Sequence, residues 1–186
     1  MLSSTRPGIV RLFLALNLAP DVRQRVHAAT QALRNAAPDA RWVDESKLHL
    51  TLKFLGEQPE ALVAPLSAAL DQAAARSREL DLQFGAIGAF PNFRRPRVVW
   101  VGVAPDPKLE LLHHDVEVAC EGVGLAVEGR PFRPHLTLAR VDKDDGALRQ
   151  AAKGLKVREV SVVDSVDLML SAGGRYRVLH AAAMGR

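Results

Sequence analysis

Histidine followed two places later by threonine is the pairing with the most chemical potential in this 186-residue sequence, and it occurs twice, within the phrase His-Leu-Thr-Leu. The first copy contains His49 and Thr51, and the second contains His135 and Thr137. Because side chains alternate between the two faces of a strand, each histidine shares a face with its threonine while both leucines face a core. One such polar pair is ordinary on the wet face of a half-buried strand. Packing gives no reason for the same pair to recur, so the repeat favours a chemical role.

Two imidazoles that face each other across a cleft can divide a proton transfer, because the ordinary pKa of histidine, about 6.5, keeps both protonation states accessible near neutrality. Two threonine hydroxyls can donate hydrogen bonds to an oxyanion placed between them. An acid, a base and two donors for non-bridging oxygens describe an in-line displacement at a phosphodiester, for which no metal ion or other cofactor is expected. Arg140 follows Thr137 by three residues and offers a cation for the phosphate.

A longer duplication surrounds the two motifs and indicates which elements must position them. An apolar, strand-like segment begins at Arg11 and another at Arg97, and each is followed by a helical pattern and then by a motif strand. The separation from Arg11 to His49 and from Arg97 to His135 is the same, 38 residues. Two such units packed about a pseudo-two-fold axis would bring both histidine–threonine faces toward one central cleft.

Hydrophobic periodicity and turn residues predict the elements in detail. Gly56 is expected to close the first motif strand, Gly173-Gly174 to form a hairpin turn, and Ala86 to share a buried face with Leu80, Leu82 and Phe84. Many short strands with tight turns predict a bilobal α+β fold, with two antiparallel sheets and flanking helices, in one domain spanning 1–186. Strands are expected at 9–18, 41–43, 48–55, 80–87, 97–103, 132–141, 155–163, 166–170 and 176–181, and helices at 20–36, 62–73, 109–122 or 109–124, and 145–152.

The composition is that of a soluble globular chain, since 48% of the residues are hydrophobic, 25% are charged and the net charge is +4. Arginine accounts for 19 of the 25 basic residues, which favours a phosphorylated or nucleic-acid partner; codon bias with solvated charged faces explains the excess equally well. Cys120 is the only cysteine, so neither an intrachain disulfide nor a cysteine-based metal cluster can form, as suits a reducing compartment. No apolar stretch approaches the roughly 20 residues of a membrane span, and a monomeric cytoplasmic protein is expected.

The chain resembles the 2H phosphoesterases, named for two His-x-Thr-x motifs, and among them the bacterial and archaeal RNA 2′,3′-cyclic phosphodiesterases, also known as 2′-5′ RNA ligases. The resemblance rests on the segments 11–16, 41–43, 47–56, 97–103 and 134–140. It implies two lobes around a V-shaped cleft and metal-independent opening of RNA or nucleotide 2′,3′-cyclic phosphate ends to 2′-phosphomonoesters. It leaves open a reversible 2′-5′ RNA ligation.

The resemblance also implies a role for each residue of the site. His49 is the expected general acid and His135 the expected general base. Contacts with the phosphate are expected from Thr51, Thr137 and Arg140, and stacking on a base from Phe54.

Phe54 is the residue on which the strand pattern and the resemblance disagree. Strict alternation places Phe54 with the core leucines and Lys53 on the histidine face, so a base-stacking Phe54 requires the strand to bulge or end before it. Elsewhere, His113 and His114 are adjacent in a predicted helix, cannot share a face and are expected at the surface. The sequence assigns no firm role to four further residues: Arg94, Arg95, Ser171 and Tyr176.

Two other functions are consistent with the same residues. A 2H enzyme acting on a 2′-5′ oligonucleotide or on a cyclic phosphate of ADP-ribose would need the same two histidines and two threonines. A non-catalytic RNA-binding module would keep the cleft, but the intact histidine in both motifs disfavours it.

Overall fold

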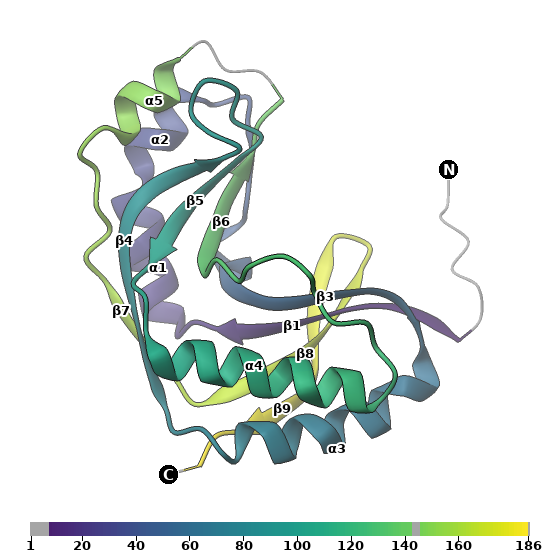
Figure 1. The fold of residues 1–186 in the computed structure, drawn as a ribbon. Coiled ribbons are helices and arrows are strands. Elements are labelled where there is room, and N and C mark those ends of the chain that lie inside the picture. The colour runs from purple at the N-terminus through teal and green to yellow at the C-terminus, as the bar shows by residue number, and fades with distance from the viewer. Residues whose placement is uncertain (1–7, 143–145, 186) are drawn as a thin grey trace.

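The strands of the computed structural model, which describes residues 8–142 and 146–185, fall into two lobes, one for each copy of the motif (Figure 1). The first lobe contains four antiparallel strands: β3 (His49–Pro59), β1 (Ile9–Asn17), β8 (Ser165–Ala172) and β9 (Arg175–Ala183). The second lobe contains four more and a short strand paired to β6: β6 (His135–Arg140), β5 (Val98–Val103), β4 (Leu80–Phe90), β7 (Val160–Val163) and β2 (Arg41–Trp42). The predicted α+β class with antiparallel strands is therefore confirmed.

Among the described residues, the strands of the two lobes pair at one point, Leu50 of β3 with Leu136 of β6. This pair makes the strands one continuous curled sheet in the order β7-β4-β5-β6-β3-β1-β8-β9, so the two predicted sheets are its two halves. The two leucines hold the same position in the two motifs and pair in the antiparallel sense. A local two-fold axis therefore relates the two motif strands at this point.

The helices cross between the lobes. α1 (Pro20–Ala29) and α2 (Gln31–Ala36) follow β1 of the first lobe but cover the sheet of the second lobe, where α2 packs on α5 (Ala147–Ala152) (Figure 1). α4 (Pro107–Gly122) follows β5 of the second lobe but packs beside α3 (Val63–Ala74), on the first lobe. Each repeat unit thus contributes its two long strands to one lobe and its helical segment to the other, which interlocks the two.

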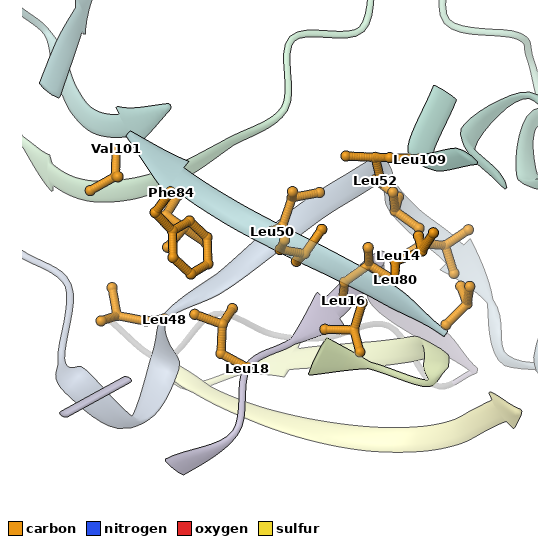
Figure 2. Packing of buried hydrophobic residues seen from close by; sticks show 14 of the residues in the cluster. Leu14, Leu16, Leu18, Leu48, Leu50, Leu52, Leu80, Phe84, Val101 and Leu109 are labelled. Carbon is orange, nitrogen blue, oxygen red and sulfur yellow. The ribbon is translucent and has the colours of Figure 1, made fainter. Parts of the chain in front are cut away.

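Leucines from both motif strands lie in a core that is continuous between the lobes. Leu50 and Leu136 are fully buried, and Figure 2 shows Leu50 in the same cluster as Leu14 and Leu16 of β1. Burying one such side chain contributes about 1.5–3 kcal/mol. The core therefore determines which face of each motif strand turns outward.

Two elements differ from the predicted ones. The single helix predicted over 20–36 is interrupted at Thr30, whose hydroxyl donates to the carbonyl of Val26 at 2.9 Å, a backward bond that bends or loosens a helix. The first motif strand does not end at Gly56. That residue has φ = 71°, which glycine adopts without strain, and β3 continues to Pro59 in register with β1.

The remaining boundaries shift for local reasons. Ala86 is exposed instead of buried, because a bulge between Phe84 and Ile87 reverses the two faces of β4. The second motif strand and β7 are shorter than predicted, while β4, β8 and β9 are longer. The predicted helix over 145–152 begins at 147 in the structure, and residue 145 lies outside the described residues. Gly173-Gly174 forms the predicted hairpin turn, with φ of 56° and 72°.

Candidate active site

Each motif strand carries a bulge at the same place, directly after its threonine. In β3 the pairing with β1 passes from Thr51 to Lys53 and skips Leu52. In β6 the pairing with β5 passes from Thr137 to Ala139 and skips the equivalent leucine. An extra residue in a strand reverses the alternation of side chains beyond it. Strict alternation therefore holds from each histidine to its threonine and fails immediately afterwards.

The bulge turns Phe54 outward and Lys53 inward. Phe54 is 73% exposed and borders the cleft with His49, whereas Lys53 is 7% exposed and buried behind the strand. The alternation pattern predicted the reverse and was wrong for both residues. Arg140 follows His135 by five residues, as Phe54 follows His49, and it is exposed in the same way. The structure thus contains the bulge that a base-stacking Phe54 requires.

Both motif histidines are held by the same backbone contact. Nδ1 of His49 lies 2.7 Å from the carbonyl oxygen of Lys47, and Nδ1 of His135 lies 2.6 Å from that of Arg133. A carbonyl only accepts, so Nδ1 donates in both rings and Nε2 is the nitrogen that can take up or release a proton. Nε2 of His49 is 3.1 Å from the hydroxyl of Thr51. The two imidazoles therefore expose the same nitrogen for proton transfer.

A cleft of about 380 Å³ brings five of the six predicted site residues together: His49, Thr51, Phe54, Thr137 and Arg140. His135 is not among the residues that line it and stands beside them on β6. Continuing the antiparallel register past the Leu50–Leu136 pair sets His49 opposite Thr137 and His135 opposite Thr51. The arrangement can place one imidazole and one hydroxyl on each side of a bound phosphate.

Aromatic rings surround His49 and reduce its contact with water. The ring of Phe13 lies 5.1 Å from the imidazole, and that of Tyr176 meets it edge-on at 5.6 Å. Burial lowers the pKa of His49, while the hydrogen bond to the Lys47 carbonyl opposes the shift. In the free protein the neutral form of His49 is therefore favoured more than in an exposed histidine.

His135 also has two aromatic neighbours, which come from the second lobe. Phe90 meets its ring edge-on at 5.1 Å, and Trp100 lies 6.0 Å away. Trp100 packs so closely on Gly88 that a Cβ added there would lie 2.1 Å from the indole. A glycine at this position is therefore what lets the indole reach His135.

Four basic or aromatic residues that the sequence did not assign also line the cleft: Arg11, Phe13, Lys47 and Tyr176. Lys47 donates to the carbonyl of Gly174 at 2.6 Å and lies 5.9 Å from the ring centre of Tyr176, so it ties the β8–β9 hairpin to the first motif. Ser171 lines the cleft as well. One signal was available, because a basic residue precedes the histidine by two places in both copies. Nothing local in the sequence indicated Tyr176.

The other residues singled out in the sequence divide between core and surface. His114 is exposed as predicted, but His113 is partly buried and stacks on Phe132 with ring centres 4.0 Å apart, so a surface position for it was wrong. Cys120 is fully buried, and burial raises the pKa of its thiol to about 11. Within 8–142 and 146–185, no three His, Cys, Asp or Glu side chains are grouped so that they could hold a metal ion. Among the same residues, no helix is long and apolar enough to cross a membrane.

Comparison with known proteins identifies the family of the chain. The model of the 2′-5′ RNA ligase superfamily matches residues 15–175. An RNA 2′,3′-cyclic phosphodiesterase of Aeropyrum pernix is 37% identical over 131 residues, 70% of this chain and 72% of the relative. One of Geobacillus stearothermophilus is 35% identical over 128 residues, 69% of this chain but only 41% of the relative. The crystal structure of E. coli LigT complexed with 3′-AMP matches with a TM-score of 0.73 and 29% identity, covering 96% of this chain and 99% of the other. The chain belongs to the 2′-5′ RNA ligase superfamily of 2H phosphoesterases.

Proposed function

We propose that the protein opens RNA 2′,3′-cyclic phosphate ends to 2′-phosphomonoesters by acid–base catalysis with His49 and His135, without a metal ion. The observation that carries the proposal is the matched placement of the two imidazoles, each donating from Nδ1 to the carbonyl two residues earlier. An acid and a base of the same kind, related by a local two-fold axis, suit a displacement with attack and departure on opposite sides of phosphorus. The relatives named RNA 2′,3′-cyclic phosphodiesterase support the substrate class.

In the proposed step a water molecule attacks phosphorus and gives a proton to Nε2 of His135. The bond from phosphorus to O3′ breaks, and the protonated Nε2 of His49 gives its proton to O3′, so the phosphate remains on O2′. Hydrogen bonds from Thr51, Thr137 and Arg140 stabilise the negative charge that grows on the non-bridging oxygens. Exchange with solvent then returns each histidine to its starting state.

The protonated state of His49 depends on the substrate. Burial lowers the pKa of His49 in the free protein, which disfavours the imidazolium that a general acid must be. A cyclic phosphodiester carries one negative charge, and an anion beside an imidazole favours the charged form. The proposed acid therefore becomes effective in the complex, where the phosphate lies next to it.

Phe54 and Arg140 determine the orientation of the bound substrate, which the two symmetric motifs cannot do by themselves. They hold equivalent positions after the two bulges, and both face the cleft. An exposed phenylalanine stacks on a nucleobase, a contact worth about 1–3 kcal/mol, whereas a guanidinium binds phosphate oxygens. We place the base on Phe54 and the phosphate toward Arg140, which sets O3′ beside His49.

Incubation of the purified protein with nucleoside 2′,3′-cyclic phosphates in EDTA tests the proposal, with ³¹P NMR to identify the product. The 2′-phosphate is expected as the single product. A 3′-phosphate or a mixture would contradict the acid and base assignment. Absence of turnover, or activity that needs added zinc or magnesium, would contradict the function itself. A 5′-hydroxyl RNA added as the nucleophile tests 2′-5′ ligation, and 2′-5′ oligonucleotides and ADP-ribose cyclic phosphates are the competing substrates.

We further infer that the protein acts as a monomer in the cytoplasm. One chain carries both motifs and brings His49, Thr51, Thr137 and Arg140 to one cleft, so the proposed reaction needs no residue of a second copy. A buried, unpaired Cys120 suits a reducing compartment. Light scattering at the assay concentration checks the oligomeric state, and a dimer mass would contradict it.

A further inference from the structure

A buried polar cluster lies behind the first motif strand and has no part in the proposed reaction. Nζ of Lys53 is 2.6 Å from Oε2 of Glu117 on α4, and it also donates to the carbonyl of Ala126 at 2.8 Å. The side chains of Lys53 and Glu117 are only 6% and 10% exposed. A buried ion pair is weak evidence for stability, because removing both charges from water offsets much of their attraction. The pair therefore calls for an explanation other than stability.

The second motif shows that the bulge itself does not need this ion pair. Ala139 holds the position of Lys53 in the other repeat, is fully buried, and follows the same bulge after Thr137. A methyl group is sufficient there to keep the strand in register. The role of Lys53 must therefore concern a part of the structure that lies beside the first motif strand and not beside the second.

The structure that lies near Lys53 is the loop 123–134, which leads from α4 to the second motif. The buried cluster holds this loop at three places. Lys53 binds the carbonyl of Ala126, and Oε2 of Glu117 accepts a hydrogen bond from the backbone N–H of Glu128 at 3.2 Å. His113, whose Nε2 lies 3.7 Å from Oε1 of Glu117, stacks on Phe132. The contacts are spread along the loop and end three residues before His135.

The residue after Phe132 supplies the contact that orients the second catalytic candidate. The carbonyl of Arg133 is 2.6 Å from Nδ1 of His135 and accepts its proton. If the loop moves, this carbonyl moves with it, and the imidazole can then turn or carry its proton on Nε2 instead. A neutral histidine with its proton on Nε2 cannot accept a proton from water at that atom.

We propose that Lys53 and Glu117 are positioning residues, which hold the loop 123–134 so that the Arg133 carbonyl keeps Nε2 of His135 free to act as a base. A residue of the first motif strand thereby controls the histidine of the second motif. The inference rests on the proposed function in taking His135 as the base. The placement of the ring can nevertheless be measured without any substrate.

Nitrogen NMR of the histidine rings provides the substrate-free test. In the wild-type protein the neutral ring of His135 is expected to carry its proton on Nδ1. In Lys53→Met the His135 signals are expected to move toward a mixture of the two tautomers. The control Lys108→Met makes the same change at an exposed position of α4 and is expected to leave them unchanged. Wild-type His135 signals in a folded Lys53→Met protein would overturn the proposal.

Kinetics provide the second readout. Lys53→Met and Glu117→Gln are each expected to lower kcat about 10- to 100-fold, the scale of a misplaced catalytic group, with KM changed by less than about 3-fold. If Lys53→Met does not fold, Lys53→Met/Glu117→Met removes both charges and leaves a neutral core, while the two hydrogen bonds to the loop are still lost. That double variant is expected to fold with low kcat. A double variant with wild-type kcat and wild-type His135 signals would overturn the inference.

The two proposals can fail separately. A wild-type protein that does not turn over cyclic phosphates would refute the proposed function. The NMR of the His135 ring would still decide whether Lys53 and Glu117 position that histidine.

Discussion

The two motif strands are alike up to the bulge and different beyond it. Each has a histidine held by the carbonyl two residues earlier, a threonine on the same face and a bulge after the threonine. Beyond the bulge the first strand has Lys53 and Phe54 where the second has Ala139 and Arg140. The shared half is what symmetric proton transfer needs. The differing half is what a substrate with a base at one end and a phosphate at the other requires.

The aromatic neighbours of the two histidines differ in kind. Each histidine has one neighbour from inside the duplicated segments, Phe13 for His49 and Trp100 for His135, and these two do not hold equivalent positions: Trp100 pairs with Thr137, whereas Ala15 pairs with Thr51. The second neighbour comes from outside the repeat, Tyr176 of β9 for His49 and Phe90 of β4 for His135. Duplication thus accounts for the two motifs, and different aromatic residues flank each of them.

Removal of either motif histidine, which both strands share, is expected to have the largest effect on turnover. His49→Ala and His135→Ala should each lower kcat by at least roughly 10²-fold, the usual scale for the loss of a general acid or base, in proteins that still fold. The exposed His114→Ala is the matched control and should have wild-type kinetics. Measured kcat near the wild-type value in either well-folded active-site variant would remove that histidine from the mechanism.

Gly88→Ala tests the aromatic wall of the second half only. The added Cβ would lie 2.1 Å from the Trp100 indole, so the ring must move away from His135. We expect about 1–3 kcal/mol less free energy of unfolding and a fall in kcat on the order of 10-fold. Gly122→Ala, which meets nothing within 4 Å, is the control for chemical denaturation and kinetics. An unchanged kcat in Gly88→Ala would show that the position of Trp100 does not matter.

Phe54→Ala and Arg140→Ala test the differing half at equivalent positions. Loss of stacking on Phe54 should raise KM for a nucleoside cyclic phosphate about 10-fold, from a contact of about 1–3 kcal/mol. Arg140→Ala should lower kcat/KM by a similar factor through the phosphate. A ribose 2′,3′-cyclic phosphate without a base separates the two in steady-state assays. Only Arg140→Ala should impair its turnover, and equal effects of both variants would refute the division of roles.

Tyr176→Ala is expected to have the smallest effect, a shift of the pH profile. Burial lowers the pKa of His49, so kcat/KM, which needs His49 protonated and its partner neutral, should fall as pH rises through that lowered value. Removing the ring exposes His49 to water, which raises its pKa and moves this limb to higher pH. Tyr176→Phe keeps the ring and should leave the limb in place. Because the pKa of His49 is lower in the folded than in the unfolded state, this histidine contributes to the free energy of unfolding above the ordinary histidine pKa. The contribution is lost as pH falls through the lowered pKa. An unmoved limb in Tyr176→Ala would disprove the role of the ring.

Local rules were sufficient to predict the shared half of the site from the sequence. Strand alternation is a property of the backbone, so His49 and Thr51 had to share a face opposite Leu50. The equal spacing of the two repeats predicted that the motifs would be related by a two-fold axis, and the pairing of Leu50 with Leu136 bears this out. The strands, helices and hairpin turn were predictable from periodicity and glycine positions, with errors mainly at their ends.

Only the tertiary structure decided which way the residues beyond each threonine face. A bulge arises from how a strand is paired with its neighbour, and the partners of β3 and β6 are distant in sequence, so no pattern within the motif revealed that Phe54 faces out and Lys53 in. The same holds for Tyr176, which reaches His49 from 127 residues further along the chain. Helix spacing likewise could not show that His113 would meet Phe132. The alternation of side chains is set by neighbours along the chain. Strand register and side-chain contacts depend instead on which distant segments the folded core places next to each other.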